Sequence, residues 1–144
     1  MQQPAAGPSP VAYARIAGLL YLAIFLMAPF AEFFVREGLI VAGDPSTTAA
    51  NIRESEGLFR AGFFTDVLVF VIEIAQAALL YFLLRPVSRT LALITSFARL
   101  AMAAILGLNL LNMYVGLQLL TGAEYAAAFD GNQLEALAFV FLRA

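Results

Sequence analysis

The sequence contains no cysteine and no histidine, and all eight of its basic residues are arginine. Without cysteine there are no disulfides and no thiol chemistry. Without histidine there is no imidazole base, and the common zinc and haem ligand sets are missing. Hydrolytic enzymes of the common kinds are therefore not expected, and neither a cofactor nor a metal site is predicted. Because the net charge is only −2, nothing indicates a nucleic-acid partner.

Charged residues are scarce as well. They make up 12% of the 144 residues, whereas hydrophobic residues make up 62% and the mean hydropathy is +0.88. Soluble domains are about half apolar and about a quarter charged. A soluble chain of this length has too small a core to bury so much apolar surface. Since lipid accepts an apolar exterior, the composition predicts an integral membrane protein.

Three apolar stretches are long enough to cross a bilayer, which takes about 20 residues of helix. They occupy residues 16–36, 61–84 and 91–120. The third is longer than a crossing requires, so we expect it to be tilted or to begin in the membrane interface. Pro29 is expected to kink the first span, with neighbouring helices satisfying the carbonyl group that it frees. The predicted fold class is an all-α, polytopic transmembrane helical bundle.

Polar segments are expected at the ends of this bundle. Residues 1–12 are predicted to be a disordered tail because of their proline, glycine and glutamine content, and residues 13–144 form a single transmembrane domain. Asp44 as a helix cap, followed by proline, predicts a short amphipathic helix over residues 45–56 that ends at Gly57. Its weak apolar stripe places it flat on the outer membrane surface or over the mouth of the bundle.

The last apolar stretch predicts a partial helix over residues 132–144, with Asp130 as its cap. The apolar part, from Leu134, is roughly 11 residues or about 16 Å long at about 1.5 Å per residue. That is about half the hydrocarbon thickness of a bilayer, and the helix end would leave carbonyl groups unsatisfied in lipid. We therefore expect the natural gene to continue past Ala144, so that this chain is a fragment.

Arginine placement predicts the orientation. The tight turn after the second span carries Arg85 and Arg89 and no acid, whereas the loop after the third span carries Glu124 and Asp130 and no base. Because positive charge is retained on the cytoplasmic side, the arginine turn is expected in the cytoplasm. The N-terminus, with Arg15, is then cytoplasmic as well, and the segment after the first span lies outside.

Polar residues inside the spans are the main candidates for function, because charges in hydrocarbon are costly and often functional. Asp66, Glu73 and Gln76 fall close to one face of the second span, since seven residues make nearly two helical turns. Glu73 and Arg99 lie equally far from the turn near Pro86, and hence at equal depth in an antiparallel hairpin. This spacing predicts an interhelical ion pair that sets the register of the hairpin. The alternative is that Arg99 reaches lipid phosphates in the interface.

Two sets of candidate residues result. The intramembrane set is Asp66, Glu73, Gln76, Arg99 and Asn109, with Asp66 expected near the level of Asn109. The alternative for these residues is that they only satisfy partners on adjacent helices and fix their packing; Glu32, near the end of its span, is expected to reach the interface. The outer set is Asp44, Asn51 and Arg60, which could line a ligand-facing rim. The alternative there is a solvated helix face with local ion pairs.

Several short motifs are distributed along the chain. They are Tyr13-Ala14-Arg15-Ile16-Ala17-Gly18-Leu19-Leu20-Tyr21, Gly43-Asp44, Thr48-Ala49-Ala50-Asn51-Ile52, Leu58-Phe59-Arg60, Asp66, Leu83-Leu84-Arg85-Pro86-Val87 and Arg99-Leu100. With these motifs the chain resembles the bacterial multi-span membrane family known as domain of unknown function 4386. The resemblance implies a multi-pass protein of the bacterial inner membrane, in a family whose members usually continue through further spans. It implies topology and no chemistry.

Three functions are compatible with these observations. The favoured one is a membrane protein without an assigned biochemical role that acts through helix packing, with the lipid bilayer, a second copy or other membrane subunits as its partners. The second is a proton- or ion-coupled transporter component that uses Asp66, Glu73 and Arg99. The third is a membrane enzyme with its site at the outer face. A dry bundle with satisfied polar groups favours the first, a water-filled path to Glu73 the second, and a deep pocket lined by the outer set the third.

Overall fold

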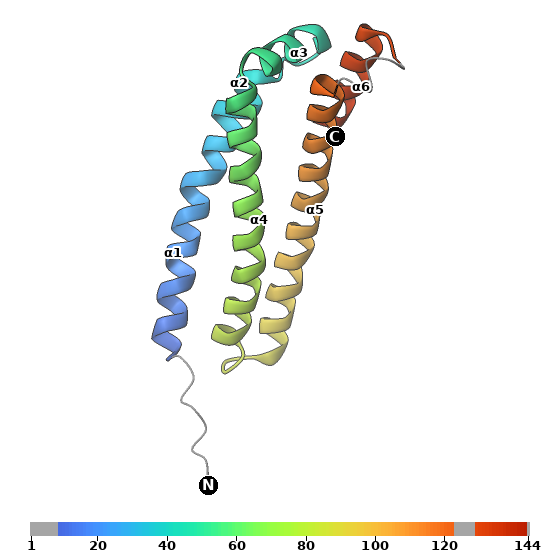
Figure 1. Cartoon of the computed structure of the whole chain (residues 1–144). Helices are drawn as coiled ribbons and strands as arrows, with labels where there is room; N and C mark the ends of the chain where they lie inside the picture. Colours follow the sequence, from blue (N-terminus) through green and yellow to red (C-terminus); the bar gives the residue numbers. More distant parts are fainter. Residues whose placement is uncertain (1–8, 123–128, 144) are drawn as a thin grey trace.

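The computed structural model describes residues 9–122 and 129–143, which are helical apart from short connections. Three long helices run side by side and three short helices gather at one end of them (Figure 1). The elements are α1 (Pro10–Pro29), the π-helix η1 (Phe30–Arg36), α2 (Glu37–Leu39), α3 (Pro45–Glu54), α4 (Glu56–Leu84), α5 (Arg89–Thr121) and α6 (Gly131–Arg143). The all-α fold class predicted from the sequence is confirmed.

Within the described residues, three continuous helical stretches are long and apolar enough to cross a membrane. They are Pro10–Leu39, Glu56–Leu84 and Arg89–Thr121, with mean hydropathies of 2.0, 2.4 and 2.0. Their outward side chains are large and apolar, as at Phe25, which is 73% exposed. Such an exterior would be a liability in water and is suited to hydrocarbon. The chain is therefore built as a membrane protein.

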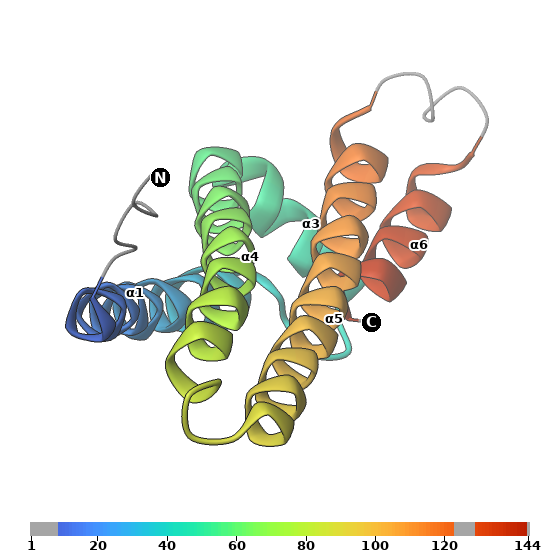
Figure 2. The same ribbon diagram turned by 90° about the horizontal axis from the view of Figure 1, so that it is seen from below.

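The helix α4 lies in the middle of the arrangement. It packs against α1 and η1 on one side and against α5 on the other, and α6 packs along α5 (Figure 2). Small residues allow α4 and α5 to approach closely: a Cβ atom at Gly107 would lie 3.3 Å from the Phe70 ring, and Ala92 and Ala103 are buried. The two other long helices, α1 and α5, thus both pack against α4.

The main apolar core lies at the end where the short helices gather. It brings side chains of η1, α2, α3, α4, α5 and α6 together. Its fully buried members include Val35, Ile52, Phe59 and Ala138. The short helices therefore bury their apolar faces against the ends of α4 and α5. Of the two positions predicted for α3, the structure shows the one over the mouth of the bundle.

The first helix starts earlier than predicted. It begins at Pro10, because the Ser9 hydroxyl accepts a hydrogen bond from the amide of Ala12 at 3.3 Å and proline is well suited to the first helical position. Residues 10–12 are thus helical and do not belong to the predicted tail, whose residues 1–8 lie outside the described residues.

The structure also shows how the chain responds to Pro29. Proline has no amide hydrogen to donate to the preceding turn, and directly after it the helix widens into the seven-residue π-helix η1. Wider turns of this kind are rare and often mark functional positions. The helix then continues through α2 to Leu39.

The second span begins five residues earlier than predicted, at Glu56 instead of residue 61. The preceding helix, α3, starts after Asp44 as predicted but ends at Glu54, because Ser55 leaves the helical region with φ −114° and ψ 37°. Gly57 therefore lies in the first turn of α4 and does not terminate α3.

The last helix begins at Gly131, directly after Asp130, close to the prediction. The Asp130 carbonyl accepts the amides of Gln133 and Leu134, both at 3.0 Å, and the Asp130 amide donates to the Gln133 side chain at 3.3 Å. The side chain that completes this cap is thus that of Gln133. Glu124 and Ala144, which entered the sequence arguments, lie outside the described residues.

Candidate functional site

Arg99 of α5 joins all three long helices. Its guanidinium donates to Glu73 of α4, with 2.6 Å between Nη1 and Oε2, and to the hydroxyl group of Tyr21 of α1. The Arg99 Cζ atom also lies 4.8 Å from the centre of the Tyr21 ring, in a cation–π contact. The predicted Glu73–Arg99 ion pair is confirmed.

The two charged side chains of this cluster are partly buried within the bundle, whereas Tyr21 is 38% exposed. The side chains of Arg99 and Glu73 are 22% and 14% exposed. A single charge at such a depth costs about 2.5–3.5 kcal/mol on insertion scales, whereas a carboxylate and a guanidinium in contact compensate each other. The result is an electrically neutral group with a fixed geometry. Tyr21 was missed by the sequence analysis, because no tight turn relates its depth to that of Arg99.

Arg36, at the end of η1, holds a second cluster. Its guanidinium donates to Glu32, one turn earlier, and to Asp66 of α4. The Asp66 side chain is only 4% exposed, whereas Glu32 is 46% exposed. Glu32 therefore pairs with Arg36 while half of its side chain still faces outward, and Asp66 receives its counter-charge from another helix.

A close approach of η1 to α4 positions this cluster. A Cβ atom at Gly62 would lie 2.7 Å from the Cγ atoms of Val35, so only glycine leaves room for the fully buried Val35 side chain. Arg36 follows Val35 directly, and Asp66 lies one turn after Gly62. The Val35–Gly62 contact therefore sets the depth at which Arg36 meets Asp66. Arg36 was missed as a site residue because it stands at the predicted end of the span.

Gln76 is fully buried between α1 and α4. Its Nε2 atom donates to the carbonyl oxygen of Ala17 at 3.0 Å, and its Oε1 atom has no hydrogen-bond partner among the described residues. The three polar residues predicted to share a face of α4 thus have different partners: Asp66 pairs with η1, Glu73 with α5 and Gln76 with α1. Each of the three residues thus forms its own polar contact with a neighbouring helix.

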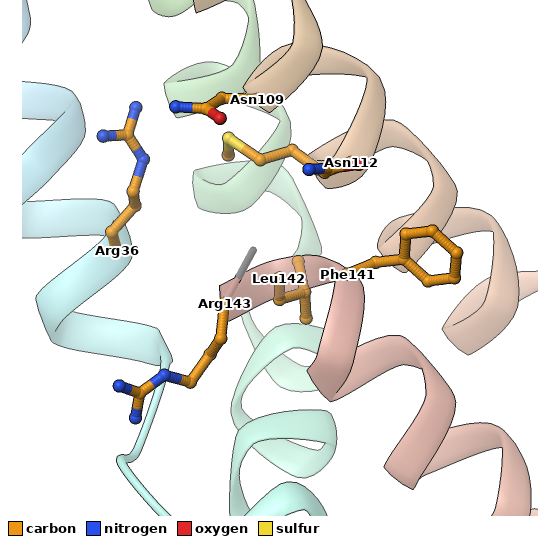
Figure 3. Close-up of a pocket in the computed structure, with 7 residues that line it drawn as sticks. Arg36, Asn109, Asn112, Phe141, Leu142 and Arg143 are labelled. Carbon is orange, nitrogen blue, oxygen red and sulfur yellow. The ribbon is translucent and has the colours of Figure 1, made fainter. Parts of the chain in front are cut away.

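Asn109 lies close to Arg36, the partner of Asp66. This position agrees with the prediction that Asp66 and Asn109 lie at similar depths. It lines a cavity of about 140 Å³ between η1, α5 and α6, and Figure 3 shows Asn109 facing Arg36 across this space. A wider cleft of about 410 Å³ also reaches Arg36 and includes Glu32 and Glu37. Neither Glu73 nor Arg99 is among the residues that line these two spaces.

Asp44, the first of the outer candidates, is the cap of α3. Its carboxylate accepts the amide of Thr47 at 2.9 Å, the Thr47 hydroxyl at 2.7 Å and the Ser46 hydroxyl at 2.9 Å. These hydrogen bonds, that from the Thr47 amide first, lower the pKa of Asp44 from 3.8 to about 2. Asp44 thus has all of these donors within its own helix turn.

The other outer candidates make local contacts elsewhere. The Asn51 side chain donates to the carbonyl oxygen of Leu39 at 3.3 Å and connects α3 to the end of α2. Arg60 pairs with Glu56 one turn earlier in α4, at 2.6 Å. The structure therefore gives Asp44, Asn51 and Arg60 three separate local contacts and does not assemble them into one site.

A family model matches residues 16–144 of the chain. The chain belongs to this family, Domain of unknown function (DUF4386). Membership in DUF4386 confirms the resemblance drawn from the motifs, and the family description itself states no activity. No curated protein and no solved structure matches the chain.

The DUF4386 chain carries two polar clusters at different depths, each with both signs of charge. Within residues 9–122 and 129–143 no three acidic side chains gather as a metal site would require. Because the carboxylates of Asp66 and Glu73 are each bound to an arginine, the chemistry most directly available to both clusters is hydrogen bonding between helices.

Proposed function

We propose that this DUF4386 chain acts through helix packing, as a membrane subunit that associates with a second copy of itself or with other membrane subunits. The observation that carries the proposal is Arg99, which joins α4 through Glu73 and α1 through Tyr21. Polar contacts of this kind act between transmembrane helices and fix their register. The intramembrane charges thus serve the assembly of helices.

The same cluster supports association beyond the single chain. Arg99 keeps 22% of its side chain exposed at the level of the hydrocarbon, where lipid tails offer no hydrogen-bond partners. Met102, one turn further along α5, is 63% exposed. We infer that another protein helix covers this side of α5 and shields the cluster from lipid.

Paired cysteine substitutions test this association, because the chain has no native cysteine. Met102→Cys and Leu108→Cys are matched, since the two side chains are 63% and 62% exposed but point to different sides of α5. On mild oxidation in native membranes, Met102→Cys is expected to form disulfide-linked dimers and Leu108→Cys is not.

Two differently tagged copies of the chain should also purify together from mixed detergent extracts. If another subunit covers this side instead, Met102→Cys should cross-link to that subunit at a fixed stoichiometry. A chain that purifies alone, and that cross-links equally at both positions or at neither, would overturn the proposal.

An ion-coupled component is a second candidate, and one observation favours it. The cavity and the wider cleft both reach Arg36, whose guanidinium also pairs with the buried Asp66. In sealed vesicles that contain the purified protein and a pH-sensitive dye, this function predicts proton entry that Asp66→Asn abolishes. Equal leak in vesicles with and without the protein would exclude it.

We also propose that the chain lies in the inner membrane of a bacterium with its N-terminus in the cytoplasm. Arg85 and Arg89 flank the α4–α5 turn, and Arg15 lies near the start of α1. The start of α1 lies at the same end of the bundle as this turn (Figure 1). The sequence has no acidic residue over 1–31 or over 74–123. Arginine in the short segments that flank transmembrane helices is typical of the cytoplasmic side.

A further inference from the structure

An apolar groove runs between α4 and α5 toward their connecting turn. Its volume is about 330 Å³, and its lining includes Ile74, Ala78, Tyr81 and Phe82 of α4 with Ser96 and Leu100 of α5. The single hydroxyl hydrogen of Ser96 is shared between the carbonyl oxygens of Ala77 and Ala92, so Ser96 has no hydrogen left to donate into the groove. The groove therefore suits a hydrocarbon chain.

Two arginines continue the faces that line this groove. Arg85 lies four residues after Tyr81 and seven after Ala78, so it shares the groove face of α4. Arg89 lies seven residues before Ser96 and shares the groove face of α5. Both arginines are exposed, and neither forms an ion pair within the described part of the chain.

The charge at this end is uncompensated. No acidic residue occurs between residues 74 and 123, so the arginines have no carboxylate neighbour on α4 after Glu73 or on α5. The first amides of α5, at Arg89 and Thr90, lie at the positive end of a 33-residue helix. The two guanidinium groups therefore favour a negatively charged group here.

The dimensions fit one leaflet of a bilayer. From Arg85 to Ile74 the helix advances by 11 residues, which is about 16 Å at about 1.5 Å per residue. Half of the hydrocarbon core measures about 15 Å. A lipid with its phosphate at the arginines would place an acyl chain along the full groove.

We infer that the α4–α5 groove, with Arg85 and Arg89 at its open end, is a binding site for an anionic phospholipid. The two guanidinium groups hold the phosphate, and one acyl chain lies against Ala78, Tyr81 and Leu100. Neither Glu73 nor Arg99 lines this groove, and the inference does not rest on the proposed function.

The test compares phosphatidylglycerol with phosphatidylcholine of the same acyl chains, added to the purified chain in detergent and quantified by native mass spectrometry. Phosphatidylglycerol is expected to bind more tightly, and Arg85→Gln with Arg89→Gln should weaken it about 30-fold, since each arginine near an anionic headgroup contributes about fivefold. Equal affinity for the two lipids would overturn the proposal.

Three further variants and probes separate the contributions. Arg15→Gln removes a matched exposed arginine from α1, which contributes no residue to the lining of the groove, and should leave most of the affinity intact. Ala78→Phe fills the groove from an exposed position and should weaken binding severalfold without a change in charge. Glycerol phosphate, which lacks acyl chains, should bind far more weakly than the lipid. A loss for Arg15→Gln as large as that of the double variant, no loss for Ala78→Phe, or equal binding of glycerol phosphate would each show that the groove is not the site.

Discussion

Glu73 of α4 and Arg99 of α5 meet across the hairpin with 2.6 Å between Oε2 and Nη1. The two residues lie 13 positions before and 13 positions after Pro86. In an antiparallel hairpin with a tight turn, this symmetry places both Cα atoms at the same depth. The ion pair thus fixes the register of α4 against α5. The hydrogen bond from Arg99 to Tyr21 fixes the depth of α1 relative to both helices.

Removal of either partner of this pair should destabilise the fold more than removal of both. Glu73→Gln and Arg99→Gln are each expected to cost about 3–5 kcal/mol, because each leaves a charge in hydrocarbon without its counter-charge. The double variant should cost less than the sum. Thermal unfolding in detergent and the yield of folded protein measure these effects.

The pair Arg60 and Glu56 provides the control. It has the same two residue types but is 56% and 38% exposed, so its removal should change stability by less than about 1 kcal/mol. Strictly additive losses at Glu73 and Arg99, or equal effects at both pairs, would contradict the structural role assigned to the buried pair.

Gly62→Ala should weaken the contact between α4 and η1. The new methyl group would lie 2.7 Å from the Cγ atoms of Val35, and such overpacking costs about 1–3 kcal/mol. Gly57→Ala, in the same helix and with open space around it, should be neutral or stabilising by up to about 1 kcal/mol. Val35→Ala should rescue Gly62→Ala in thermal unfolding; no rescue would mean that Val35 is not the obstacle.

The two carboxylates that bind Arg36 should differ in importance. Asp66→Asn removes a nearly buried partner and is expected to cost about 3–5 kcal/mol. Glu32→Gln removes a partner that is 46% exposed and should cost less than about 1 kcal/mol. Unfolding temperatures of the two variants, measured side by side, give the comparison. Equal losses would show that burial does not set the strength of these contacts.

Protonation of Asp44 should loosen the start of α3 in acid. The folded-state pKa of about 2 lies below the ordinary value of 3.8, so the stability that Asp44 contributes is fully present above pH 3.8 and is lost as pH falls through about 2. Asp44→Asn keeps a capping side chain that does not titrate. The difference in unfolding temperature between the wild type and Asp44→Asn should be constant above about pH 4. Below about pH 4 the unfolding temperature of the wild type should fall relative to that of Asp44→Asn. A constant difference down to pH 2 would contradict this.

Cysteine labelling tests the proposed orientation. Val87 in the α4–α5 turn is 81% exposed and Glu54 of α3 is exposed at the other end of the bundle. In intact cells a membrane-impermeant thiol reagent should label Glu54→Cys and should label Val87→Cys only after the membrane is opened. The reverse pattern would show that the arginine end faces outward.

The sequence determined those features that depend on counting along one helix or across one tight turn. Apolar length predicted the three spans, and Asp44 followed by proline predicted the start of α3. The Glu73–Arg99 pair was predictable because the rise per residue of a helix is fixed and the turn at Pro86 is short. Depth can be computed from the sequence only where both conditions hold.

Tertiary structure decided the contacts of the first span. Its connection to α4 contains α2 and α3, so no residue count relates the depth of Arg36 to that of Asp66, or the depth of Tyr21 to that of Arg99. The π-helix after Pro29 also changes which side chains face α4, since its turns are wider than those of an α-helix. The bond from Gln76 to Ala17 and the fit of Val35 against Gly62 depend on the same rotation. Which face of a helix meets its neighbour is settled by packing between elements, and the period of a single helix does not contain that information.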